Sequence, residues 1–114
     1  MILWRNLHLH DGGWLYRGDA KIYLTPQQDR LISLFMRAQG LPVSLESQVV
    51  ALRGDRPRRH TDPKTLRVVL CTMRLLLDQV GVRVVSLPGG QGRRKMELES
   101  DEDAVRSGEH QPGT

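Results

Sequence analysis

The sequence predicts an α+β domain in which a small antiparallel sheet is followed by three helices and a C-terminal β-hairpin. Three observations predict this order. Residues 1–24 alternate apolar and polar side chains around glycine turns, which is typical of short strands. The middle of the chain carries apolar residues at helical spacing behind capping signals. After Gly81 the alternation returns on both sides of a glycine-rich turn, which predicts a hairpin.

The size of the chain and its apolar runs limit the class of protein. Its 114 residues suffice for one domain with one hydrophobic core. Apolar runs such as residues 75–77 are far shorter than the roughly 20 residues of a membrane span, and the start lacks a secretory signal pattern. A single cysteine, Cys71, provides neither an internal disulfide nor a zinc-binding thiolate cluster. We therefore expect a cytoplasmic protein without a membrane segment, a metal or another cofactor.

The N-terminal strands are predicted from alternation and turn residues. One strand is expected from Leu3 to Leu9, with Leu7 on the same side as these two leucines. Residues 14–16 and 20–24 predict two further strands around a Gly-Asp turn. Together they predict an antiparallel meander.

The first two helices are predicted from their ends. Thr25 can accept a hydrogen bond from an early backbone amide, and Pro26 at the first helical position loses no bond. The helical spacing that follows ends at Gly40, a residue suited to a left-handed helix end. Ser44 predicts the cap of a short second helix that stops before Gly54.

The third helix is predicted to begin behind Thr61 or Asp62, with Pro63 as its first residue, and to run to about Val80. Its core side is expected to hold Leu66, Val69 or Leu70, Met73, Leu77 and Val80. The opposite side carries Lys64, Arg67, Cys71, Arg74 and Asp78. Val68, Leu75 and Leu76 widen the apolar surface beyond one stripe.

The C-terminal part divides into a hairpin and a tail. Residues 82–87 and 95–98 predict two strands joined by a basic, glycine-rich turn at 88–94. The folded domain is therefore expected to cover residues 1–98. Residues 99–114 are acidic and poor in large apolar side chains, so we expect a disordered acidic tail.

The charge is unevenly distributed along the chain. Residues 1–96 hold sixteen Lys or Arg against seven Asp or Glu, whereas residues 97–114 hold one against six. Much of the basic excess lies in the third helix, the loop before it and the hairpin after it. A concentration of this kind is typical of a surface that faces the phosphates of a nucleic acid.

Four groups of residues occur in an order that resembles a known family. They are Leu24-Thr25-Pro26 with Leu31-Ile32 and Leu34-Phe35; Gly40 with Val43-Ser44 and Glu46; Leu66, Leu70, Met73-Arg74 and Leu77; and Gly90-Gln91-Gly92. Over roughly residues 1–98 this set resembles the OmpR/PhoB family of response-regulator output domains, which are winged helix-turn-helix domains. Arg53 and Arg93 stand where the family usually has aromatic residues.

The resemblance also bears on control of the domain. A phosphate-accepting receiver domain usually precedes such an output domain. It is not expected here, because the first predicted strand begins near Met1. Phosphorylation control within this chain is therefore not predicted.

The resemblance and the basic surface together imply a transcription regulator that binds double-stranded DNA in a sequence-specific manner. The third helix, about residues 62–80, would enter the major groove, and the wing at 88–95 would meet the minor groove or the backbone. The candidate DNA-binding residues are Lys64, Arg67, Cys71, Thr72, Arg74, Arg93, Arg94 and Lys95. Arg56, Arg58 and Arg59 are candidates for a phosphate contact or, by the resemblance, a contact with RNA polymerase.

Other partners remain open from the sequence. A winged-helix adaptor could bind RNA polymerase or another regulator through Leu75, Leu76 and the acidic tail. Two copies could also pair as a homodimer on repeated half-sites of DNA.

An enzyme is not predicted, and no catalytic residue is assigned. His8 and His10 share one side of a strand, but no carboxylate or thiol set completes a metal site. Cys71 has no histidine partner suggested nearby in the sequence.

Overall fold

The computed structural model of the chain describes residues 1–54 and 63–99. Over these residues the elements are β1 (Ile2–Trp4), β2 (Leu7–Leu9), β3 (Trp14–Arg17), β4 (Ala20–Tyr23), α1 (Pro26–Arg37), α2 (Leu45–Arg53), α3 (Pro63–Leu77), the 3₁₀ helix η1 (Asp78–Val80), β5 (Val82–Ser86) and β6 (Arg94–Leu98). This is the predicted order of sheet, three helices and hairpin. The predicted third-helix cap at Thr61 or Asp62 lies outside the described residues, and so do residues 100–114 of the tail predicted for 99–114.

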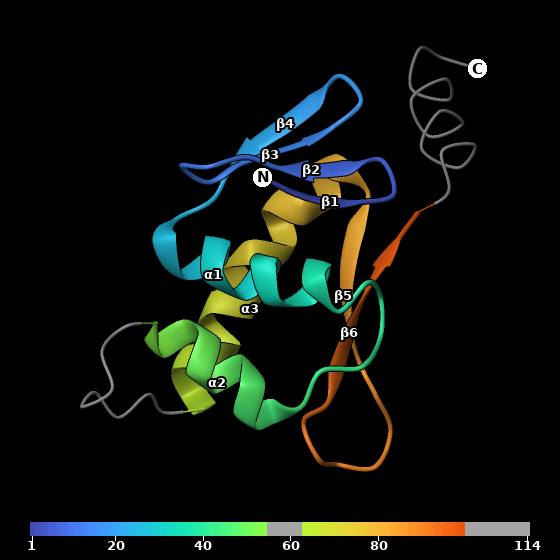
Figure 1. Cartoon of the computed structure of the whole chain (residues 1–114). Coiled ribbons are helices and arrows are strands. Elements are labelled where there is room, and N and C mark those ends of the chain that lie inside the picture. Colours follow the sequence, from blue (N-terminus) through green and yellow to red (C-terminus); the bar gives the residue numbers. More distant parts are fainter. Residues whose placement is uncertain (55–62, 100–114) are drawn as a thin grey trace.

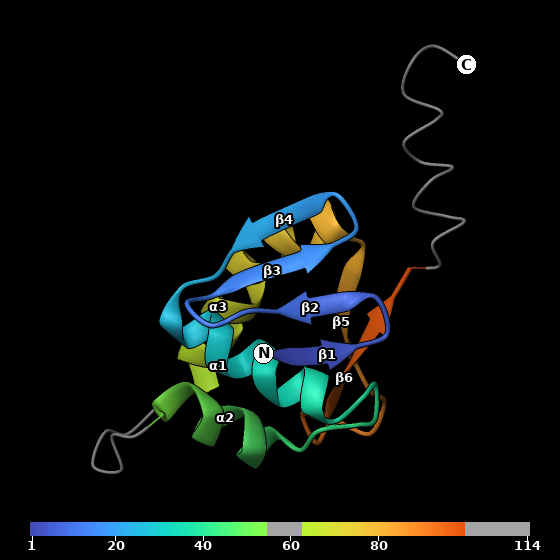
Figure 2. The ribbon, with the colours of Figure 1, turned by 45° about the horizontal axis from the view of Figure 1, so that its top comes forward.

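The N-terminal sheet has four antiparallel strands in the order β1-β2-β3-β4, and Figure 2 shows them side by side. The single strand predicted from Leu3 to Leu9 is wrong, because the chain reverses at Arg5, whose φ is 53°. The reversal places Trp4 opposite Leu7. Residues opposite each other share a face of the sheet, so Trp4 is buried beside Leu7 while Leu3 is 53% exposed.

The start of α1 confirms the predicted cap and adds a second bond to it. The Thr25 hydroxyl accepts from the backbone N–H of Gln28 at 3.4 Å, and the Gln28 side-chain oxygen accepts from the Thr25 N–H at 3.0 Å. This reciprocal pair is a capping box. At the other end, Gln39 and Gly40 both have positive φ, so the chain leaves the helix in the left-handed region.

Helix α2 has the predicted limits and is tied to α1 at its C-terminal end. The Ser44 hydroxyl accepts from the Ser47 N–H at 3.1 Å and caps its start. The Arg30 guanidinium donates to the carbonyls of Ala51 and Leu52 at 3.1 and 2.9 Å. The positive charge of Arg30 also interacts favourably with the partial negative charge at the C-terminus of α2.

Helix α3 confirms the predicted core side. The buried residues are Leu66, Val69, Leu70, Met73, Leu77 and, in η1, Val80. The predicted last turn of this helix is 3₁₀ rather than α-helical, and it ends at Gly81, whose φ is 66°.

The C-terminal hairpin pairs β5 with β6 in a register that runs from Val82↔Leu98 to Ser86↔Arg94. Strand β6 therefore begins at Arg94, one residue earlier than predicted. Val43, between α1 and α2, forms a bridge to this residue: the Val43 N–H donates to the Arg94 carbonyl at 2.7 Å, and the Arg94 N–H donates back at 3.0 Å. The hairpin is thus attached by its backbone to the segment that leads into α2.

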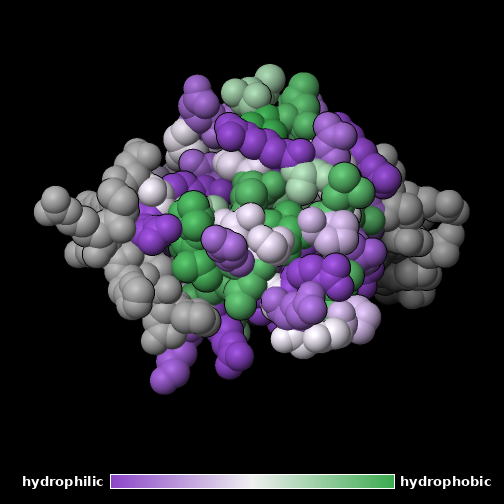
Figure 3. Space-filling model, turned by 60° about the horizontal axis from the view of Figure 1, so that its bottom comes forward, coloured by the Kyte–Doolittle hydropathy of each residue, from purple (hydrophilic) through white to green (hydrophobic). Residues whose placement is uncertain are grey.

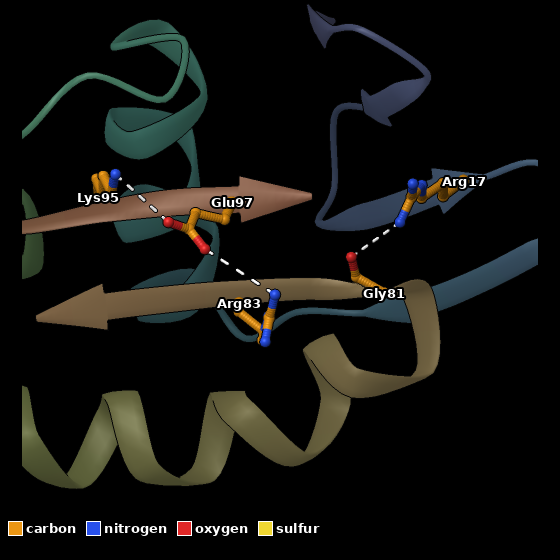
Figure 4. A network of polar contacts seen from close by, with 5 residues as sticks. All are labelled: Arg17, Gly81, Arg83, Lys95 and Glu97. Carbon is orange, nitrogen blue, oxygen red and sulfur yellow. Dashed lines mark hydrogen bonds and ion pairs between the residues drawn. The ribbon is translucent and has the colours of Figure 1, made fainter. Parts of the chain in front are cut away.

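A buried arginine attaches the N-terminal sheet to the C-terminal half of the domain. Arg17 is 8% exposed and donates to the carbonyls of Val80 at 3.0 Å and Gly81 at 2.8 Å, to the carbonyl of Glu99, and to the Asn6 side-chain oxygen at 3.1 Å. Figure 4 shows its bond to Gly81 next to the hairpin. One side chain thus joins β3, the end of η1 and the residue after β6.

The described elements share one hydrophobic core, to which every strand and helix contributes. The sheet lies at one end over α1, and α2 and the hairpin turn lie at the other end (Figure 1). Seen from that second end, hydrophobic surface is bordered by hydrophilic side chains (Figure 3). None of the described helices is long and apolar enough to cross a membrane.

Candidate nucleic-acid interface

The outer side of α3 exposes the residues that periodicity assigned to it. Lys64, Arg67, Cys71 and Arg74 are all exposed. Burial of the opposite side of the helix against the core forces this arrangement, since positions three and four apart share a face. Between residues 63 and 80 the only acidic residue is Asp78, near the C-terminal end.

The hairpin brings a third arginine to the two of α3. Burial lowers the pKa of the Arg94 guanidinium, and the positive charges of Arg74 and then Arg67 lower it further. Arg74 also lines a groove of about 450 Å³ together with Asp78 and strand β5. Positive charge from α3 and from β6 therefore gathers on one side of the domain, although the two segments are far apart in the sequence.

Arg94 is half-buried and is held by α2, a contact that the sequence prediction did not include. Its Nη1 donates to the Gln48 side-chain oxygen at 2.9 Å and to the Gly92 carbonyl at 3.3 Å. The sequence placed Arg94 among the candidate DNA contacts. In the structure this guanidinium is already bound to the protein on at least one side.

Gln48 connects α2 to the hairpin and is fully buried. Its amide nitrogen donates to the carbonyls of Val43 at 3.0 Å, Ser44 at 3.2 Å and Gly92 at 3.0 Å. Sequence reasoning missed this residue. The available signal was its spacing from Leu45 and Leu52, because a polar residue on the apolar side of a helix is expected to be buried with hydrogen-bond partners.

The remaining wing candidates differ in how free their charges are. Arg93 is exposed, and its backbone carbonyl accepts from the Leu87 N–H at 2.9 Å. Lys95 is partly buried, and its Nζ lies 3.4 Å from one carboxylate oxygen of Glu97. The other oxygen of Glu97 lies 4.0 Å from the Nη2 of Arg83 (Figure 4). Arg93 is thus the wing cation that projects outward, whereas the charge of Lys95 is shared with Glu97.

The smaller α3 candidates are both exposed. Cys71 is a free thiol. The Thr72 hydroxyl donates to the carbonyls of Val68 at 3.1 Å and Val69 at 3.0 Å, within its own helix. In this arrangement Thr72 can accept a hydrogen bond from a partner, but its own proton is occupied.

The other residues singled out from the sequence lie away from this surface or outside the described part of the chain. Arg56, Arg58 and Arg59 are outside the described residues. His8 and His10 are exposed on the N-terminal sheet, where the His10 ring packs 4.7 Å from the ring of Tyr16. Within residues 1–54 and 63–99, no group of three or more histidine, cysteine, aspartate or glutamate residues is arranged to hold a metal ion.

Comparison with known proteins identifies the fold. No family model matches the chain, and no curated protein sequence matches it. Among solved structures, the C-terminal domain of the nisin resistance regulator NsrR, a lantibiotic response regulator, matches with a TM-score of 0.68 at 20% sequence identity. The match covers 82% of this chain and 94% of that domain. It confirms the predicted α+β winged helix-turn-helix fold, which the chain shares with that response-regulator domain.

Proposed function

We propose that this winged-helix chain is the DNA-binding part of a transcription regulator and that it binds double-stranded DNA in a sequence-specific manner. Helix α3 enters the major groove, and the hairpin turn between β5 and β6 lies at the minor groove or the backbone. The observation that carries this proposal is that the exposed Arg67 and Arg74 of α3 lie close enough to the half-buried Arg94 of the hairpin for their charges to lower its pKa. Such a concentration of positive charge matches a polyanion.

The shape of the basic side favours a duplex. The major groove is wide enough for one α-helix, and α3 exposes one complete side without an acidic residue before Asp78. Arg67 and Arg74 are the residues proposed to reach guanine edges or phosphates. Lys64, exposed at the start of α3, and Arg93, exposed next to Arg94 in the hairpin, are the residues proposed to contact phosphates.

The buried contacts of Arg94 suggest a division of roles in the wing. Arg94 holds the hairpin against Gln48 and adds to the local positive potential, whereas the exposed Arg93 contacts the DNA. Lys95 contributes a weaker contact because Glu97 competes for its charge. A polymerase contact by Arg56, Arg58 and Arg59, pairing of two copies on DNA, and a cytoplasmic location remain predictions.

A binding titration tests this proposal. Duplexes selected from a random pool are titrated by fluorescence anisotropy at several salt concentrations, with Arg67→Ala and Arg74→Ala as test variants. Each change should weaken binding to the selected duplex by about 1–3 kcal/mol more than binding to random DNA if the arginine reads a base. Arg93→Ala should instead reduce the salt slope by about 0.9 for one lost phosphate contact.

Lys21→Ala is the matched control, since Lys21 is an exposed cation of the N-terminal sheet whose ammonium lies 5.3 Å from the Trp14 ring. It removes the same charge as Arg67→Ala and should leave binding nearly unchanged. Equal losses for Lys21→Ala and Arg67→Ala would show that net charge alone drives binding, and would contradict the proposed placement of α3.

A protein-binding adaptor is the second candidate. It is favoured by the outer face of the N-terminal sheet, where Leu3, Trp14 and Tyr23 are exposed. Trp14 and Tyr23 pack edge to face with their rings 5.3 Å apart. Aromatic residues are enriched at protein interfaces. Absence of binding to any duplex at low salt would contradict the DNA proposal and favour this one.

A further inference from the structure

The most outward line of α3 is apolar rather than charged. Val68 is 63% exposed and Leu75 is 73% exposed, and the free thiol of Cys71 lies between them. Spacings of three, four and seven residues place these side chains in one row along the helix. We call Val68, Cys71 and Leu75 the apolar row. Leu76, by contrast, is half-buried and packs against the core.

The surroundings of the apolar row are mainly basic, and between residues 63 and 80 the exposed Asp78, one turn after Leu75, is the only acidic residue. Lys64 precedes it by one turn, and Arg67 and Arg74 flank it on the side that faces Arg94 of the hairpin. An apolar protein surface covering the row would have to remove water from these cations without neutralising them, which is costly. A polyanion that also presents isolated apolar groups would satisfy both the cations and the row.

The DNA major groove offers this combination. Among the base edges in that groove, thymine alone presents an apolar group, its 5-methyl, while cytosine presents an N–H donor and the purines present polar atoms. Phosphates line both sides of the groove. Val68 and Leu75 are separated by about 10 Å along the helix axis. At about 3.4 Å per base pair, the row can reach thymines up to about three base pairs apart.

We infer that Val68, Cys71 and Leu75 contact the 5-methyl groups of thymines in the major groove, so that the target sequence carries A·T pairs at fixed positions relative to the bases or phosphates held by Arg67 and Arg74. The inference rests on the proposed DNA-binding function. It makes the apolar row a determinant of specificity, and it makes DNA preferred over the same sequence with uracil in place of thymine.

Replacing single thymines by deoxyuridine tests this inference directly, since that change removes the methyl group and keeps the base-pairing groups. In a duplex selected from a random pool, deoxyuridine at the contacted positions should weaken binding of the unaltered protein about fourfold per methyl. Deoxyuridine elsewhere in the duplex should have no effect.

The test continues with Val68→Ala and Leu75→Ala, which alter exposed positions and retain good helix propensity. Each variant should bind the thymine duplex more weakly and should lose the penalty at one deoxyuridine position. Leu3→Ala is the matched control: Leu3 is also exposed, but on the N-terminal sheet. This control should keep the full penalty at every position.

The outcomes separate the inference from the function on which it rests. If no duplex binds the protein, the DNA-binding proposal fails. If a duplex binds but deoxyuridine has no effect at any position, the inference is overturned while the DNA-binding proposal stands. If the penalty persists undiminished in both Val68→Ala and Leu75→Ala, another side chain contacts the methyl groups and the assignment to the apolar row is overturned.

Discussion

Replacing Gln48 by methionine should loosen the hairpin from the helices without enlarging the core. Methionine is an unbranched residue of similar length, so it fills the same fully buried space. The change removes the amide that donates to Val43, Ser44 and Gly92, and the oxygen that accepts from Arg94.

The size of the effect follows from which partners keep a second bond. The Val43 carbonyl still accepts from the Arg94 N–H, and the Ser44 carbonyl still accepts from the backbone N–H of residue 48 at 3.1 Å. The principal loss is the bond to the half-buried Arg94 guanidinium, and bonds to charged groups contribute about 1.5–3 kcal/mol. We expect Gln48→Met to lower the free energy of unfolding by about 2–4 kcal/mol.

A double-mutant cycle isolates the contact. Urea unfolding is measured for the unaltered protein, Gln48→Met, Arg94→Met and the double variant. The double variant replaces both polar groups by apolar ones. Its loss of unfolding free energy should therefore be much smaller than the sum of the losses in the two single variants. We expect a coupling energy of about 1.5–3 kcal/mol.

Hydrogen exchange supplies the structural readout. The amides of Val43 and Arg94, which form the bridge at the base of the hairpin, should lose protection in Gln48→Met. The amides of β3 and β4 should keep their protection, apart from the decrease that follows from the lower global stability of the variant. A coupling energy below about 0.5 kcal/mol, within the range of independent sites, would refute the reasoning that this pair holds the hairpin in place.

Three further predictions concern the stability of the domain and are measured by urea or thermal unfolding. Arg17→Lys should lower the free energy of unfolding by about 2–4 kcal/mol, because an ammonium cannot reach all the separate acceptors of the buried guanidinium. These acceptors lie on Asn6, Val80, Gly81 and Glu99. A loss below about 1 kcal/mol would contradict this role. Gly81→Ala should be more destabilising than Gly18→Ala. Both glycines have left-handed φ, but a Cβ at Gly81 would lie 2.5 Å from the Arg17 Nη1, whereas one at Gly18 meets nothing within 4 Å. Equal losses of stability would show that backbone strain alone is responsible. Thr25→Ala should cost about 1 kcal/mol by removing half of the capping box of α1, while Thr25→Ser should cost much less; similar losses for the two would contradict the capping role.

Sequence periodicity predicted the helices and the exposed side of α3 because these depend on local spacing. The caps at Thr25 and Ser44 and the outward positions of Arg67 and Arg74 follow from rules that act within a few residues. The hairpin reversal at Arg5 was missed for a related reason: no glycine occupies the turn, and the left-handed φ falls on an arginine instead.

The roles of Arg17, Gln48 and Arg94 were not predictable in the same way. Arg17 binds a carbonyl 64 positions away, and the Gln48 and Arg94 side chains are 46 positions apart. No local pattern encodes such partners. Arg94 carries a partial signal. Once the strand is extended by one residue, Arg94 lies two positions before the buried Met96 and therefore on the same, inner side of β6.

The bonds of Arg17 have a practical consequence for where the chain can be shortened. The Glu99 carbonyl accepts from Arg17, and the Glu99 N–H donates to the Gly81 carbonyl at 2.9 Å. A protein trimmed to the predicted boundary at Leu98 would lose both of these hydrogen bonds, including the one that joins the first sheet to the residue after the last strand. A label or fusion partner attached just after residue 99 would instead start beside the N-terminal sheet, at the end of the domain remote from the hairpin turn (Figure 1).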